Sequence, residues 1–348
     1  YATRNGANQF QGSAFAFHRN RVLEANNFFS NRQGVARGHF VYNQFGGRLG
    51  GPVVKDRTFF FASYEGIQNR RGSFLAGVVP TASEREGRFS QAIFDPLTTR
   101  REGNIFIRDA FPQNQIPSSR IDRVSANLRS LWPAPNATGV NNFLSNASAF
   151  DKENQYSGRV DHLFSQSHRM FVRYSYNNND SGLPDWYGNI ASPAVFTQQI
   201  RNHNAVLDDS VTFSPTFIGS FRYGMTRQFN ARKTRSDGTD LTDFGWPLEF
   251  SQARQDSSLP QISAAGYLGM SSTGLFRRAI EAHVLAATFQ KISGRHSVKF
   301  GSDWRVYREN SATNGTSAGS FAFNVGFTRG PNAQDRKSTR LNSSHVSQ

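Results

Sequence analysis

The sequence of 348 residues contains no cysteine and only three methionines. The absence of cysteine excludes disulfide bridges, thiolate metal sites and cysteine nucleophiles, and it fits export into an oxidising compartment. No stretch of the chain approaches the roughly 18 consecutive apolar residues of a membrane-spanning helix. A helical membrane protein is therefore excluded. A protein that crosses with strands is not, because a strand needs an apolar residue only at every second position.

What the sequence does contain is alternation of apolar and polar residues. In 216–227, apolar side chains at every second position form one face, and polar side chains form most of the other. The same period of two recurs in 155–176 and 296–308, and in the glycine-rich hairpin 43–66, whose turn is predicted at 52–56. Each of these segments is therefore predicted to be a strand or hairpin with one apolar and one polar face.

The connections between these strands alternate between short and long. Outer-membrane barrels show this asymmetry, with tight periplasmic turns and large extracellular loops, and runs of about ten residues can cross a bilayer at a tilt. We therefore predict an all-β fold, an antiparallel transmembrane β-barrel in the bacterial outer membrane. The short connections are 52–56, 165–168, 214–215 and 293–295, and the long ones are about 20–42, 70–154, 178–203 and 229–280.

Basic residues outnumber acidic ones by 40 to 25, which gives a formal net charge of +15. Lys and Arg are spread over strands and loops, so nucleic acid is not predicted as a partner. The one dense basic run lies in 335–345, whose letters DRKSTRLNSSH look like the translation of a sequencing-library adapter. We therefore assign 331–348 to an adapter-derived or disordered tail. The remaining charge favours contact with outer-membrane lipid and anionic lipopolysaccharide, or an anionic solute route.

Several segments together resemble the TonB-dependent outer-membrane receptors, specifically the Oar-like group common in acidobacterial genomes. The segment 3–20 resembles the junction between plug and barrel, although Arg4 stands where that junction often has serine. The segment 44–66, QFGGRLGGPVVKDRTFFFASYEG, is similar to the second and third barrel strands of the group. Pieces of its first large barrel loops are matched, in order, by VPTASEREGRFS at 79–90, IFDPLTT at 93–99, and IPSSRID with LWPAPN within 116–136.

The resemblance implies that 1–8 end a plug domain and that 9–330 form the amino-terminal part of a barrel of about 22 strands. A partial, open sheet of nine or ten strands with long extracellular loops is therefore expected, from a truncated interior fragment without signal peptide or TonB box. Such receptors bind a substrate at the loops and the plug, and an inner-membrane TonB complex supplies energy for uptake. The substrate is left open between a siderophore, a glycan, a peptide and an exported protein.

The polar strand positions supply the candidate site residues, because on a barrel they face the lumen, where they line a transport path or pair with one another. No catalytic or metal site and no cofactor are predicted, and we do not expect an enzyme. Neither Asp161 with His162 nor Glu281 with His283 has a third ligand or a nucleophile. The lumen-facing candidates are Glu65, Arg159, Asp161, Arg173, Arg222, Lys299, Asp303 and Arg305.

Two other classes share parts of this pattern. A passive outer-membrane porin or barrel adhesin would share the strands, and an exported carbohydrate-binding β-sandwich would share the many aromatic residues. The long connection 70–154 favours a substrate-capturing receptor. Two local features are also predicted. The first is that 70–154 holds any helix present, near 122–131. The second is an irregular strand 203–214, where Asp209 either faces lipid or is moved inward by a bulge.

Overall fold

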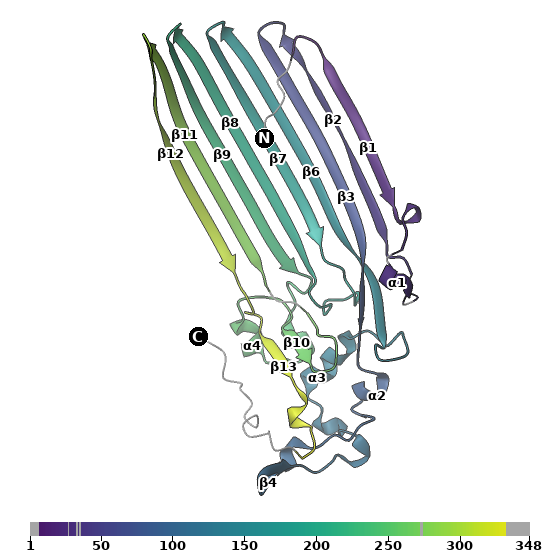
Figure 1. Cartoon of the computed structure of the whole chain (residues 1–348). Helices are drawn as coiled ribbons and strands as arrows, with labels where there is room; N and C mark the ends of the chain where they lie inside the picture. The colour runs from purple at the N-terminus through teal and green to yellow at the C-terminus, as the bar shows by residue number, and fades with distance from the viewer. Residues whose placement is uncertain (1–6, 27, 33, 35, 272–273, 332–348) are drawn as a thin grey trace.

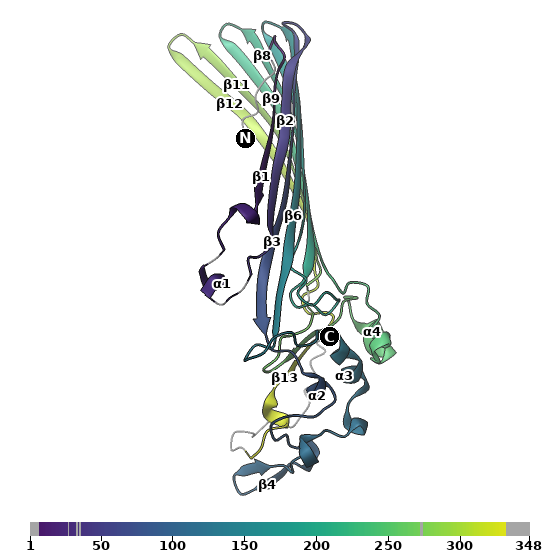
Figure 2. The same ribbon diagram turned by 90° about the vertical axis from the view of Figure 1, so that its right-hand side faces the viewer.

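A computed structural model describes residues 7–331 except 27, 33, 35, 272 and 273. Its main element is one antiparallel sheet of nine strands, in the order β1-β2-β3-β6-β7-β8-β9-β11-β12. This order follows the chain, and the edge strands β1 and β12 do not pair with each other. Figures 1 and 2 show a curved, open sheet. The predicted partial barrel sheet is confirmed, and the described residues do not form the two packed sheets of a sandwich.

The nine strands of the large sheet are β1 (Gln11–Asn20), β2 (Phe40–Val54), β3 (Thr58–Gly77), β6 (Phe143–Ser165), β7 (His168–Gly182), β8 (Phe196–Ser214), β9 (Phe217–Thr234), β11 (Phe276–Ser293) and β12 (His296–Thr313). Two small sheets pair β4 (Arg100–Glu102) with β5 (Ile105–Ile107), and β10 (Gln261–Ala264) with β13 (Ser320–Phe323). The helices are α1 (Phe28–Arg32), α2 (Ala82–Arg85), α3 (Arg123–Leu128) and α4 (Leu248–Ala253). Helix α3 confirms the helix expected near 122–131, and the Asp122 side chain caps its amino terminus by accepting a hydrogen bond from the Ser125 amide. The prediction that 70–154 holds any helix present is wrong, because α1 and α4 lie in other connections.

The strands are longer than the runs of about ten residues that the alternation predicts. Strand β6 has 23 residues and β3 has 20, and their ladder runs from Thr58 opposite His162 to Gly77 opposite Phe143. Toward Gly77 polar side chains occur on both faces, so the period of two is lost although the backbone pairing continues. The prediction that residues 70–77 and 143–154 belong to a loop is therefore wrong, because both segments extend the ladder.

All tight turns of the sheet lie at one end, and the long connections gather at the other (Figure 1). The turns are 55–57, 166–167, 215–216 and 294–295, each overlapping a predicted turn. The long connections are 21–39, 78–142, 183–195 and 235–275, each shorter than predicted because the strands continue into them. The asymmetry of the connections is therefore confirmed, with boundaries moved by several residues.

The pairing register decides which side chains share a face. Tyr64, Tyr156 and Tyr176 are opposite one another on neighbouring strands, so they lie on one side of the sheet, which we call the apolar face. The opposite side is the polar face. One aromatic row crosses the apolar face through Phe45, Tyr64, Tyr156, Tyr176 and His203. We call it the upper row because it is the row nearer the long connections, which Figure 1 draws at the bottom. The lower row, near the tight turns, contains Phe164, His168, Phe213, Phe217, Phe289 and Phe300.

The two aromatic rows are separated by about the thickness of a membrane. On β6 the separation from Tyr156 to Phe164 is about 27 Å along the strand, at ~3.4 Å per residue. A tilt of roughly 40° reduces this to a height of about 20 Å, close to the ~25 Å apolar band of outer-membrane barrels. Only the part of each strand between the rows therefore has the dimensions of a membrane crossing.

Asp209 stays on the apolar face, where its partners in register are Met170 and Phe221. The register shift of β8 lies between Thr212 and Ser214, closer to the turn, so the alternative in which a bulge moves Asp209 inward is wrong. Oδ1 of Asp209 is 2.7 Å from Nε2 of His168. This contact satisfies the carboxylate near the lower aromatic row.

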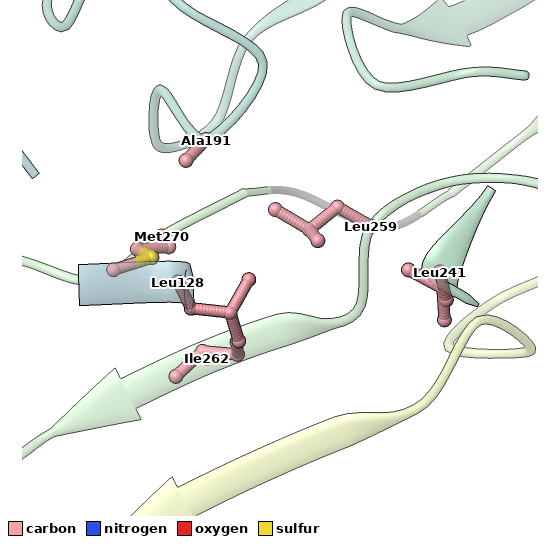
Figure 3. Close-up of a cluster of buried hydrophobic side chains, with 6 residues drawn as sticks. All are labelled: Leu128, Ala191, Leu241, Leu259, Ile262 and Met270. Atoms are coloured by element: carbon pink, nitrogen blue, oxygen red, sulfur yellow. The ribbon is translucent and has the colours of Figure 1, made fainter. Parts of the chain in front are cut away.

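Three of the four long connections fold into one unit together with the segment that follows β12. We call this unit the loop cap, and it consists of the described residues of 78–142, 183–195, 235–275 and 314–331. Its core joins side chains that are far apart in sequence, including Leu128, Ala191 and Leu241 (Figure 3). The indole Nε1 of Trp132 donates to the Leu268 carbonyl oxygen at 2.8 Å, and β10 pairs in parallel with β13. The loops therefore form a defined surface with its own core. The full buried set is Leu128, Ala191, Leu241, Leu259, Ile262 and Met270.

Candidate functional site

The polar face carries all eight sequence-predicted candidates, as the register shows. Six of them fall in two neighbouring rows across the sheet, which we call the charged rows. One row contains Arg159, Arg173 and Arg305, and the other contains Asp161, Arg222 and Asp303. Glu65 and Lys299 lie outside these rows. The eight side chains therefore belong to one surface and do not converge on a single site.

Arg159 and Asp161 form the most enclosed ion pair of the charged rows. They are two residues apart on β6, which places both side chains on the same face. Nη2 of Arg159 is 2.6 Å from Oδ1 of Asp161, and Nε donates to Oδ2 at 2.9 Å. The guanidinium carbon lies 3.8 Å from the centroid of the Phe171 ring. A cation–π contact and two charge-assisted hydrogen bonds hold the Arg159 side chain against the polar face of the sheet.

Sequence analysis missed one partner in the charged rows, Asp208. Nε of Arg222 donates to Oδ2 of Asp208 at 2.6 Å, and only 7% of Asp208 is exposed. The alternation within 203–214 places Asp208 on the polar face once the apolar positions of β8 are assigned to the other face. Arg173, in the other row, donates from Nη2 to Oδ1 of Asn204 at 2.8 Å. The rows therefore hold fixed charges bound by neighbours on the same face.

The remaining candidates have different surroundings. Glu65 accepts a hydrogen bond from Nε2 of Gln44 at 2.6 Å. Lys299 lies near the turn 294–295, opposite Gln290, and Asp303 and Arg305 form an exposed pair at 2.6 Å on the edge strand β12. Exposed pairs of this kind contribute little stability, because water screens both charges. These side chains therefore add little to the pairing of the strands.

A second set of polar side chains, which sequence analysis did not single out, extends the polar face toward the loop cap. Asn202 Nδ2 donates to Asn177 at 3.2 Å, Gln228 Nε2 donates to Asn202 at 3.0 Å, and Asn177 Nδ2 donates to Glu153 at 2.6 Å. In the sequence, the pattern that indicates this set is the recurrence of amide residues at every second position of β7 and β8. We call this set the amide ladder: Gln155, Asn177, Asn179, Asn202, Asn204, Gln228 and Asn230.

Two interactions in the loop cap involve shifted pKa values. Arg120 donates to both carboxylate oxygens of Asp95, at 2.9 and 3.0 Å, and this contact holds the pKa of Asp95 below its usual value. Burial, with a hydrogen bond from its hydroxyl to Glu84, raises the pKa of Tyr267 to about 12. The cap therefore contains polar anchors as well as an apolar core.

Among the described residues, no group of three or more His, Cys, Asp or Glu side chains is arranged to hold a metal ion. None of the described helices combines the length and apolar character needed to span a membrane.

Comparison with known protein families identifies an outer-membrane domain. The family model described as an outer membrane beta barrel domain matches residues 2–345. No curated protein and no solved structure matches the chain significantly.

Proposed function

Because this chain belongs to the family of outer membrane beta barrel domains, we propose that it forms part of the wall and surface loops of a TonB-dependent receptor of the Oar-like group. The chain is an outer-membrane barrel protein of the bacterial outer membrane, and its sheet supplies nine strands of such a wall. The proposed function is energy-coupled uptake of a substrate, without enzymatic chemistry of its own.

The observation that carries this proposal is the loop cap. Leu241 and Leu259 are fully buried in a core shared by several connections, so the cap offers an ordered surface at the end of the sheet opposite the tight turns. An ordered surface loses less conformational entropy on capturing a ligand than separate flexible loops do. A passive pore needs only an open route, and ordered loops of this extent add nothing to that role.

In this proposal the polar face lines the lumen, where the eight candidates form part of the transport path. The charged rows and the amide ladder supply a wettable wall whose hydrogen-bonding groups are largely bonded to one another. A plug domain would lie against this wall, and the inner-membrane TonB complex would act through that plug. The substrate is one of the classes that the resemblance leaves open, namely a siderophore, a glycan, a peptide or an exported protein.

The test replaces 78–142 by a short glycine-serine linker in the intact receptor. Cells lacking their other receptors are offered labelled siderophores, oligosaccharides and peptides. We expect uptake of one probe in the parent strain, and its loss both in the loop variant and after removal of TonB. The matched control carries the same linker at the turn 294–295, at the opposite end of the sheet, and should keep uptake.

Two outcomes would contradict this proposal. Uptake that persists without TonB would favour the passive porin. Barrel insertion is followed by the gel shift between heated and unheated samples, and failure of the loop variant to insert would assign 78–142 a structural role instead of ligand capture.

A further inference from the structure

The two faces of the sheet differ in charge in the strand segments that run from the level of the upper aromatic row to the loop cap. On the polar face, four cations are balanced by four anions. They are Arg19, Arg71, Arg232 and Arg278, and Glu65, Asp151, Glu153 and Glu309. On the opposite face, the same segments carry seven cations and two anions. They are Arg70, Lys152, Arg201, Arg227, Lys233, Arg277 and Arg308, and Asp180 and Glu281. The basic composition of the chain does not explain this difference, because both faces belong to the same strands.

The seven cations, which we call the basic belt, lie at the edge of the apolar band and beyond it. Arg227 and Arg308 are in register with His203, at the level of the upper aromatic row. Lys152 is four residues from Tyr156 on β6, and Arg70 is six from Tyr64 on β3. At about 3.4 Å per residue and a tilt of roughly 40°, Lys152 and Arg70 lie about 10 to 15 Å beyond the aromatic rings. Lipid headgroups occupy the zone next to the hydrocarbon of a membrane.

Most cations of the basic belt form no ion pair with an acidic side chain among the described residues. Within the described residues, Arg201 pairs with Asp180 at 2.9 Å and Lys233 with Asp237 at 3.3 Å. The other five cations have no ion pair there and are exposed. Glu281, between Arg227 and Arg308 in register, lies 3.1 Å from His283. The belt therefore presents net positive charge outward at the height of the headgroups.

A hollow of about 430 Å³ lies at the upper end of this belt. Arg277 and Ala312, which are opposite in register, contribute to its wall from the sheet. The remaining lining includes four amide and hydroxyl side chains, Ser251, Gln255, Ser257 and Asn314, together with Leu275 and Phe276. Arg254 adds a second guanidinium, and Asp237 adds a carboxylate that is paired with Lys233 at 3.3 Å. Arg277 is four residues beyond Glu281 on β11, about 14 Å farther from the apolar band along the strand. Amides, hydroxyls and a guanidinium are suited to sugar hydroxyl groups that carry or adjoin an anion.

We infer that this outward face binds phosphorylated glycolipid headgroups of the outer leaflet. Arg227 and Arg308 hold a phosphate close to the apolar band, and the hollow beside Arg277 receives the sugar portion. Several cations acting on one headgroup bind it more firmly than a single surface charge would. The inference rests on the location of the barrel and is independent of energy-coupled uptake, so either can fail without the other.

The test compares the intact barrel in detergent with the variant R227Q/R277Q/R308Q. Native mass spectrometry measures binding of diphosphorylated lipid A, dephosphorylated lipid A and phosphatidylglycerol. We expect diphosphorylated lipid A to bind the parent best, and the triple variant to bind it about tenfold or more weakly. The matched control is R71Q/R232Q/R278Q, which removes three arginines at similar height from the polar face and should retain binding.

Two results would overturn the inference. One is unchanged lipid A binding in the belt variant, and the other is an equal loss of binding in the control variant. Equal binding of phosphatidylglycerol and lipid A would remove the sugar site and leave a general anionic-lipid surface. The gel shift between heated and unheated samples verifies that both variants are folded, so a loss of binding can be assigned to the missing charges.

Discussion

Replacing Leu285 with arginine tests which face of the sheet meets lipid. Leu285 lies on the apolar face between Tyr223 and Trp304, and 54% of it is exposed in the open sheet. The side chain lies between the two aromatic rows, where an arginine facing hydrocarbon costs about 2 to 4 kcal/mol. That cost corresponds to a roughly 30- to 700-fold change in the unfolding equilibrium, since about 1.4 kcal/mol is tenfold. Phe221 is a less suitable site, because Asp209 lies directly opposite and would pair with the new cation.

The matched control is Val284→Arg, on the neighbouring residue and the opposite face. Val284 lies between Gly224 and Arg305, and the latter is already bonded to Asp303, so little repulsion is expected. The free energy of unfolding is measured by urea titration of the barrel in phospholipid vesicles. We expect a loss of about 2 to 4 kcal/mol for Leu285→Arg and less than about 1 kcal/mol for the control. Equal losses, or a larger loss at Val284, would refute the assignment of the faces.

Three further predictions follow from the cap and the open sheet. Leu241→Ala should cost the loop cap about 2 to 5 kcal/mol, because Leu241 is fully buried. Hydrogen exchange should then quicken in the cap but not in the strands, and uniform quickening would contradict a separate core. The depressed pKa of Asp95 stabilises the cap above about pH 4, the ordinary range of a carboxyl group, and this contribution is lost as the pH falls through the lowered pKa. In Arg120→Gln the pKa of Asp95, followed by NMR, should return toward its ordinary value, and an unchanged pKa would mean that Arg120 is not the cause. Finally, the chain in detergent-free buffer should aggregate, because its apolar face and two strand edges lack partners. A monomer that melts cooperatively in plain buffer would contradict this.

The faces and turns could be predicted from the sequence because they depend on local rules. Alternation assigns Tyr156 and Val160 to one face and Arg159 and Asp161 to the other, whatever the neighbouring strands are. The register of the ladder then brings Arg159 beside Arg173, as both positions are polar. Strand length could not be predicted in the same way. Outside the apolar band neither face of β6 needs apolar side chains, so the segment from Phe143 onward lacks the periodic signal although its backbone is paired.

The loop cap and the partner of Arg222 depend on contacts between distant parts of the chain. Leu128 and Leu241 meet only because two long connections end at the same edge of the sheet, and nothing local in either segment specifies the other. Asp208 was overlooked because the adjacent Asp209 broke the apolar pattern and obscured the register of β8. The resemblance to a receptor family located the loops in sequence, but it could not show that they share one core.

The parallel pair β10 and β13 connects the cap to the edge hairpin of the sheet. The whole β11–β12 hairpin lies between these two short strands in sequence, so the pair holds together the segments that enter and leave that hairpin. Phe321 of β13 packs on Trp246 and Phe250, so the apolar contacts of the cap include residues from both sides of the hairpin. The shape of the cap therefore depends on where the β11–β12 hairpin lies, and a displacement of these two strands would also disturb the surface that the cap presents.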